Sequence, residues 1–387
     1  MKKIYLDNQA TTRCDPRVVE AMIPYFCEDY GNPTSDHEFG YQASTAVEKA
    51  REQVAKIIGA QGKDIVFTSG ATIAANTAII GCARFYERDK NHIITSSIEH
   101  KCVLESCKFL HENGFEISYI DPDSDGIVSP NSISRLINDK TVIVSVMAVN
   151  NEIGTIQPIR EIGEICRSRG VIFHTDAAQA VGKIDIDVVK DNIAILTLSG
   201  HKMYGPKGIG AMYIRSIPKI RVNPLIFGGG QERKLAPGTI PVPLCVGLGK
   251  ACELIREEMH EVNQKIESIK SMFFEHITQN LTQIYLNGHK NRRVPHNLNI
   301  SFAGVEGESL MMSMPGIAIS SGSACTSDTL EPSHVLKAIG IRDDLVHTAI
   351  RFGFGRFTTE SEAAYVAEKI VENVRKLRSM SPTWNES

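Results

Sequence analysis

The chain has 387 residues, of which 42% are hydrophobic and 22% are charged, which excludes a disordered, collagen-like, mucin-like or coiled-coil protein. Its formal net charge of -3 lacks the basic excess of a nucleic-acid-binding domain, and its apolar runs fall short of the ~20 residues that cross a bilayer. Asp7 follows the start of the chain too closely for a secretory signal. We therefore expect a cytoplasmic protein of two or three domains that binds neither nucleic acid nor a membrane.

Strand-like and helix-like segments alternate along the first half of the chain. The predicted strands are residues 64–68, 92–95, 116–120, 142–147, 171–174 and 194–198. The predicted helices are residues 43–58, 76–86, 103–111 and 159–169. This alternation predicts right-handed crossovers and an α/β fold with a mostly parallel sheet covered on both faces by helices. Ligands of such sheets bind outside the carboxyl ends of the strands.

The pattern changes after about Leu244. A long helix is predicted over residues 247–277, and shorter strands and helices follow it. The later strands are residues 297–302 and 317–320, and the later helices are residues 332–338 and 360–377. We therefore expect a large domain over residues 15–250 and a smaller α+β domain formed by residues 1–14 and 251–387.

The segment from Ser199 to Pro206 follows a predicted strand and contains Lys202 between hydroxyl and imidazole groups. A lysine amine forms imines with aldehydes when its surroundings lower its pKa. Ser199 and His201 are candidate phosphate ligands. The alternative is a surface lysine in a turn rich in Gly and Pro.

Two further strand ends carry polar residues. Asp176 ends an apolar strand and precedes Gln179; it is a candidate partner for the ring nitrogen of pyridoxal phosphate, or else a helix cap. The segment Phe67–Thr72 passes from a strand into a helix whose free N–H groups favour an anion such as a phosphate, unless it is an ordinary Ser/Thr cap. Together with Lys202, these segments supply what pyridoxal phosphate requires.

Nine cysteines are scattered without C-x-x-C pairs, which argues against a disulfide framework and a structural zinc site. The histidines are also scattered, and no metal is expected. Most of the cysteines are expected to be small apolar core residues. Cys325 is the exception, because it lies in the small-residue loop Ser320–Ser327, where a thiolate could swing towards a substrate.

His100 and Arg351 complete the candidates. His100 follows a predicted strand; it is a candidate general acid or base whose ring could stack on a pyridine, or else a loop residue. Arg351 lies in an apolar stretch and needs an anionic partner, either a substrate carboxylate or an internal acid. The glycine-rich segments 205–210 and 228–230 do not fit the spacing of a nucleotide-binding motif.

On these motifs the chain resembles the cysteine desulfurases of the NifS/IscS-like group, in the class V aminotransferase superfamily with PLP-dependent fold type I. The resemblance covers essentially the whole chain, from Tyr5 to Pro382. Its most specific stretches are residues 149–154, 199–210, 320–327, 331–334 and 351–359.

The resemblance implies a role for each candidate. The cofactor would be pyridoxal 5'-phosphate (PLP), joined to Lys202. The residues implied to hold its ring and phosphate are Asp176, Gln179, Asn151, His100, Ala71, Thr72, Ser199 and His201, with Thr239 supplied by the other subunit of a homodimer. Arg351 and Asn151 would hold the L-cysteine substrate. Lys202 and His100 would carry protons, and Cys325 would accept sulfur as a persulfide, leaving L-alanine. An iron–sulfur scaffold or another acceptor protein would then receive the sulfur.

Some positions depart from the family pattern. Ile73 stands where the family usually has glutamate, and Ala236-Pro237 replaces an Arg-Ser pair before Thr239. The chain also stops at Ser387, short of the C-terminal extension that bacterial members use to dock a scaffold. These departures keep two alternatives open: a PLP-binding but weakly active structural or regulatory partner, and a selenocysteine lyase or another β-elimination enzyme.

Overall fold

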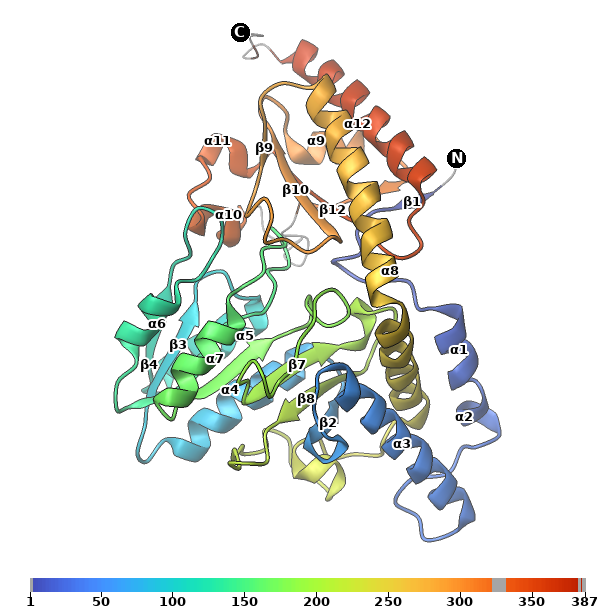
Figure 1. Cartoon of the computed structure of the whole chain (residues 1–387), viewed down its shortest axis with the longest axis vertical. Coiled ribbons are helices and arrows are strands. Elements are labelled where there is room, and N and C mark those ends of the chain that lie inside the picture. Colours follow the sequence, from blue (N-terminus) through green and yellow to red (C-terminus); the bar gives the residue numbers. More distant parts are fainter. Residues whose placement is uncertain (1–2, 322–331, 382–383, 385–387) are drawn as a thin grey trace.

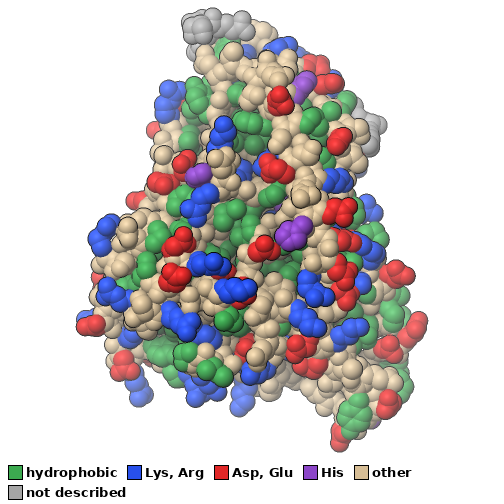
Figure 2. Space-filling view, viewed as in Figure 1, with side chains coloured by type: hydrophobic (Ala, Val, Ile, Leu, Met, Phe, Trp, Pro, Cys, Tyr) green, Lys and Arg blue, Asp and Glu red, His purple; other side chains and the backbone are tan. Residues whose placement is uncertain are grey.

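The fold was analysed in a computed structural model, which describes residues 3–321, 332–381 and 384. Figure 1 shows a broad α/β part, a smaller part beside it, and the long helix α8 (Val242–Asn280) running along both. Lys and Arg side chains are interspersed with Asp and Glu side chains on the face shown in Figure 2. Within the described ranges, no helix combines the length and the apolar character needed to cross a membrane.

A seven-stranded sheet forms the centre of the larger part. Its strands are β2 (Ile65–Thr68), β3 (His92–Ser96), β4 (Glu116–Ile120), β5 (Thr141–Ser145), β6 (Ile172–Asp176), β7 (Ile195–Ser199) and β8 (Gly210–Ile214). The spatial order is β2-β8-β7-β6-β5-β3-β4. β8 runs antiparallel to β2 and β7, and the other neighbours are parallel. The predicted mostly parallel sheet is confirmed.

The sheet is buried on both faces because successive side chains of a strand point in opposite directions. Ile143 and Ile195 pack into one hydrophobic cluster, while their neighbours Val144 and Leu196 pack into another. The covering helices are α3 (Glu38–Ile57), α4 (Ala71–Tyr86), α5 (Lys101–Glu112), α6 (Pro130–Leu136) and α7 (Ile159–Ser168). α4 and α5 contribute to the first cluster, and α3 and α7 contribute to the second.

The smaller part has its own core, which includes Phe273, Phe302, Phe352 and Phe354. Its strands are β9 (Ile284–Leu286), β10 (Asn297–Phe302) and β12 (Ala349–Gly353), joined antiparallel in the order β12-β10-β9, with β1 (Ile4–Tyr5) parallel to β11 (Ile317–Ala318). Its helices are α9 (Gly307–Met312), α10 (His334–Ala338), α11 (Asp343–Val346) and α12 (Glu360–Met380). α8 packs into the cores of both parts and continues through residue 250, so the predicted domain boundary stays a prediction.

Five short elements complete the described fold. They are α1 (Pro16–Met22), α2 (Pro24–Cys27), η1 (Gly62–Asp64), η2 (Gly200–Lys202) and η3 (Gln231–Lys234). The segment after β1 crosses between the parts: Asn8 Nδ2 donates to Gly353 O at 2.7 Å, and Thr12 N donates to His201 O at 2.8 Å. Residues 8–12 therefore join β12 to the turn that follows β7.

The described cysteines only partly follow the sequence-based expectation. Six are buried, namely Cys82, Cys102, Cys107, Cys166, Cys245 and Cys252. Cys14 is half-buried and Cys27 is exposed on α2, so the expectation holds for most of the described cysteines but not for these two. A four-residue helix at the surface has too little packed area to cover every apolar side chain it carries.

Candidate active site

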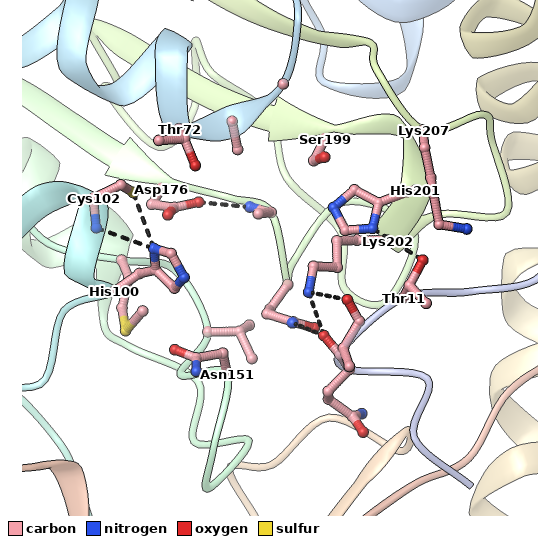
Figure 3. Close-up of a pocket in the computed structure, with 18 of the residues that line it drawn as sticks. Thr11, Thr72, His100, Cys102, Asn151, Asp176, Ser199, His201, Lys202 and Lys207 are labelled. Carbon is pink, nitrogen blue, oxygen red and sulfur yellow. Dashed lines mark hydrogen bonds between the residues drawn. The ribbon is translucent and has the colours of Figure 1, made fainter. Parts of the chain in front are cut away.

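A cavity of about 540 Å³ opens at the carboxyl edge of the central sheet, where β6 and β7 end and α4 and α5 begin. Ten of the predicted site residues line it: Ala71, Thr72, His100, Asn151, Asp176, Gln179, Ser199, His201, Lys202 and Arg351. Figure 3 shows Thr72 and Ser199 on one side of this cavity and Asn151 on the opposite side. Because ligand sites of parallel sheets form outside the carboxyl ends of the strands, residues that lie far apart in the sequence meet at this cavity.

Lys202 ends the short helix η2, which follows β7 directly. Its Nζ donates to the backbone oxygen of Ala10 at 2.7 Å and also to that of Gln9. The amine therefore lies at the cavity wall, held against the N-terminal crossing segment (Figure 3).

The start of α4 supplies an anion site. Gly70 precedes the helix with φ +152° and has no side chain to cap the first N–H groups of Ala71 and Thr72. A Cβ on Gly210 of the neighbouring β8 would lie 2.9 Å from the Gly70 Cα, so a side chain there would push the turn out of place. The backbone N–H groups of Ala71 and Thr72 and the hydroxyl of Thr72 can therefore donate to the same ligand.

His201 lies close to Ser199 on the same wall of the cavity. Its Nδ1 lies 3.1 Å from Thr11 Oγ1. Burial, together with the charges of Lys202 and Lys207, lowers the pKa of His201 to about 4. The ring is therefore neutral near pH 7 and acts as a hydrogen-bonding group rather than as a cation.

Asp176 is the last residue of β6, and its carboxylate is 6% exposed. The Ala178 N–H donates to its Oδ1 at 2.9 Å, while burial raises its pKa. A buried carboxylate of this kind is stabilised by a cationic partner. His100 caps α5 across the cavity, where its Nδ1 accepts from Cys102 N at 3.2 Å.

Arg351 lies in the middle of β12 and is 3% exposed. Its Nη2 pairs with Asp7 Oδ1 at 2.9 Å, and its Nη1 donates to Asn151 O at 3.0 Å. Both sequence-based hypotheses for Arg351, an internal acidic partner and a substrate carboxylate, are compatible with the structure. The side chain pairs with Asp7 and also lines the cavity.

The other two predicted residues differ in what the structure shows. Thr239 is exposed beyond η3, and Cys325 lies outside the described residues. The described ends of the segment that carries Cys325 nevertheless flank the cavity. Ser320 pairs through its backbone with Arg351, and His334 Nε2 lies 3.1 Å from Glu99 O, next to His100.

Other residues that line the cavity were not predicted from the sequence, including Gln9, Ala10, Thr11, Cys102 and Lys207. Lys207 belongs to the glycine-rich segment that does not fit a nucleotide-binding motif, yet this segment contributes to the cavity wall. The run of polar residues directly after Asp7 was the available signal for the N-terminal group. Its contact with Lys202 depends on tertiary structure that local patterns do not encode. Ile73, one of the departures, also lines the cavity.

Comparisons with known proteins agree with this architecture. Residues 4–366 match the family described as aminotransferase class-V. The chain belongs to the class-V aminotransferase family. It is 54% identical over 382 residues to "Cysteine desulfurase IscS" of Rickettsia rickettsii (strain Iowa), covering 98% of this chain and 93% of that protein.

Solved structures give the same result. A "NIFS-LIKE PROTEIN" matches with a TM-score of 0.90 and 38% identity, covering 97% of this chain and 100% of that one. A structure described as "SspA in complex with cysteine" matches with a TM-score of 0.82 and 38% identity, over 92% of this chain and 100% of that one. Within its family the chain belongs to the NifS/IscS-like group, as its motifs predicted, and its cofactor is pyridoxal phosphate.

The residues present fit this cofactor. The uncapped start of α4 and the hydroxyl of Ser199 can hold a phosphate, and the buried carboxylate of Asp176 suits a protonated ring nitrogen. The amine of Lys202 can join the aldehyde carbon of such a cofactor. These groups enclose one cavity, so a single ligand can reach all of them.

Proposed function

We propose that this enzyme converts L-cysteine to L-alanine and transfers the sulfur to Cys325 as a persulfide. The observation that carries this proposal is that the amine of Lys202 and the guanidinium of Arg351 line the same cavity. The first can hold PLP and the second can hold a substrate carboxylate. The related proteins named cysteine desulfurase support the same reaction.

When bound, PLP supplies an electron-withdrawing ring that acidifies the substrate Cα and stores the electrons released there. The chain supplies the surrounding groups. Asp176 keeps a proton on the ring nitrogen, and Ser199, His201 and the start of α4 hold the phosphate. Lys202 and His100 carry protons to and from the substrate.

Arg351 orients the substrate. Its guanidinium is fixed by Asp7 and by Asn151 O, so it presents a planar fork whose direction is set before the substrate arrives. A carboxylate bound there would keep the substrate in the cavity that Lys202 also lines, beside the anchored end of the segment that carries Cys325.

The length of chain between Ser320 and Cys325 allows the Cys325 thiol to reach the cavity. Ser320 is joined to Arg351 at the cavity, and five residues of chain span at most about 17 Å when extended. The Cys325 thiolate attacks the substrate sulfur as the Cβ–S bond breaks. The sulfur joins the thiol as a persulfide, and Cβ receives a proton to give alanine.

Further parts of the proposal concern the assembly. The enzyme acts as a cytoplasmic homodimer in which Thr239 of each subunit supports the phosphate site of the other. The persulfide passes to an iron–sulfur scaffold or to another sulfur-acceptor protein. If the chain divides into a domain of residues 15–250 and a domain of residues 1–14 and 251–387, the cavity is lined by residues of both domains.

The first test replaces the proposed sulfur acceptor. Cys325→Ser is expected to keep the visible absorbance of bound PLP and to lose at least ~99% of sulfide release in the presence of a thiol reductant, because a hydroxyl is a far weaker nucleophile than a thiolate. Cys27→Ser is the matched control, because Cys27 is exposed on α2 and should not affect turnover.

Mass spectrometry of the wild-type enzyme after incubation with L-cysteine locates the sulfur. One additional sulfur atom is expected on the peptide that contains Cys325, together with alanine in solution. Native sulfide release by Cys325→Ser, or labelling of a different cysteine, would show that the assigned acceptor is wrong.

A further inference from the structure

Lys183 lies behind the cavity and is 5% exposed. It follows Gln179 by four residues, and its Nζ donates to Gln179 Oε1 at 2.5 Å. Within the described parts of the chain, no carboxylate lies at ion-pair distance from this amine. Burying a lysine whose hydrogen-bond partner is a neutral amide costs folding free energy, which indicates a role beyond packing.

The groups that surround Lys183 are themselves basic. They are Lys202 and His201 of η2, Arg351 of β12 and His296, which directly precedes β10. Burial and the charges of Lys202 and Arg351 lower the pKa of Lys183 to about 7. An anionic ligand in the adjacent cavity would favour the charged form of this amine.

A chain of hydrogen bonds joins Lys183 to the reactive amine. Gln179 Nε2 donates to Gln9 O at 2.9 Å, and the same carbonyl oxygen accepts from Lys202 Nζ. Gln9 is held in turn, because its Nε2 donates to His296 O at 2.6 Å. Lys183 and Lys202 are therefore connected through the side-chain amide of Gln179 and the backbone carbonyl of Gln9.

This arrangement fixes the amide of Gln179 in one orientation. A protonated lysine amine only donates, so in this form it must face the amide oxygen, and a backbone carbonyl only accepts, so it must face the amide nitrogen. A flipped amide would place donor against donor at one end and acceptor against acceptor at the other. The N–H side of Gln179 therefore lies towards the cavity and Lys202.

We propose that Lys183 is a positioning residue that holds the Gln179 amide with its N–H side towards the cofactor and places a positive charge behind it. The inference rests on the proposed assignment of Gln179 to the cofactor ring. An N–H donor favours a negatively charged ring oxygen, and the charge of Lys183 strengthens that donor through the amide.

The test uses the holoenzyme and follows the pH at which the visible band of bound PLP changes. Removing a nearby positive charge makes protonation of the neighbouring groups easier, so Lys183→Met should raise this midpoint by about 0.5–1 pH unit. It should also weaken PLP binding about three- to tenfold, measured by titrating the apoenzyme. Lys190→Met is the control, because Lys190 is an exposed partner of Asp187 and should change neither value.

A double-mutant cycle tests whether Lys183 acts through Gln179. In a Gln179→Ala background, Lys183→Met should shift the midpoint by less than half as much. An equal shift in both backgrounds, or no shift with Lys183→Met alone, would overturn the inference. A midpoint that Gln179→Ala leaves unchanged would instead overturn the assignment of Gln179 to the cofactor.

Lys183→Gln covers the case in which the methionine variant does not fold. A glutamine can still donate to Gln179 but carries no charge, so the midpoint should rise while PLP affinity stays within about twofold. An unchanged midpoint in this variant would contradict the electrostatic part of the inference.

Discussion

Individual side chains make the cavity strongly receptive to anions. Lys202, Lys207 and Arg351 line it, and His201 is neutral, so it adds donors without adding charge. Asp176 lines it at the other side and Asp7 is already paired with Arg351. A phosphate and a substrate carboxylate would neutralise the excess positive charge of the cavity, because buried cations are stabilised by anionic partners.

Arg351 gives a prediction on substrate binding. Arg351→Lys keeps a positive charge beside Asp7 but loses the planar fork that can bind a carboxylate through two parallel hydrogen bonds. Loss of one charge-assisted hydrogen bond should raise KM for L-cysteine about ten- to hundredfold, with a smaller change in kcat. Steady-state alanine formation measures both constants.

Arg342→Lys is the control for this substitution. Arg342 pairs with Asp344 on the surface, so its replacement should leave KM unchanged. The visible absorbance of bound PLP should persist in both variants. An unchanged KM for Arg351→Lys would remove Arg351 from the substrate site and leave it as an internal partner of Asp7.

The site residues that could be predicted from the sequence are those marked by their immediate neighbours in the chain. Lys202 and Asp176 each follow an apolar strand, and the sheet rule places both at one edge. Gln9 and Lys183 could not be recognised in this way. Gln9 contacts Lys202 across 193 residues of chain, and a lysine is usually exposed, so only the packed structure shows that Lys183 is buried.

At the scale of elements, a buried ion pair attaches η3 to the edge of the sheet. Arg51 of α3 donates from Nη1 and Nη2 to the two carboxylate oxygens of Glu232 at 2.8 and 2.7 Å. Glu232 also accepts from Phe67 N of the edge strand β2 at 2.6 Å. This contact links the segment that leads to Thr239 with the strand that leads to Ala71.

Glu232→Ala should destabilise the protein strongly. The substitution leaves the buried guanidinium of Arg51 with only the exposed carboxylate of Glu48 as an acidic partner, which costs ~3–5 kcal/mol of unfolding free energy. Glu48→Ala removes the other partner of the same arginine, and its carboxylate is 62% exposed against 4% for Glu232, so it should cost no more than about 1 kcal/mol. Urea unfolding at one fixed chain concentration compares the two, and equal losses would contradict this ranking.

The elements differ in how well the sequence predicts them. β4 and β10 coincide with the predicted ranges, and α8 begins only a few residues earlier than expected. β8 was not predicted, because its five residues start with Gly210 after a turn rich in Gly and Pro. Its identity depends on pairing with β2 and β7, which lie far away in the sequence.

At the scale of the whole molecule, the position of Thr239 bears on how two subunits would assemble. It is exposed and does not line the cavity of its own chain. The η3 segment before it is held in an unusual shape, since Glu232, Arg233 and Lys234 have positive φ angles of 45°, 59° and 68°. A fixed, outward-facing segment of this kind suits a contact with a second subunit related by two-fold symmetry.

Subunit complementation tests this arrangement. Lys202→Ala removes the reactive amine of its own site, and Thr239→Glu places a negative charge beside the phosphate of the other subunit's site. Either variant alone should be almost inactive. A heterodimer of the two, isolated with two affinity tags, contains one site with an intact Lys202 and an intact Thr239, so it should recover about half of the wild-type activity. Thr278→Glu, an exposed threonine of α8, should remain fully active as a homodimer. If Thr239 instead served its own chain, no site in the heterodimer would be complete and no activity would return.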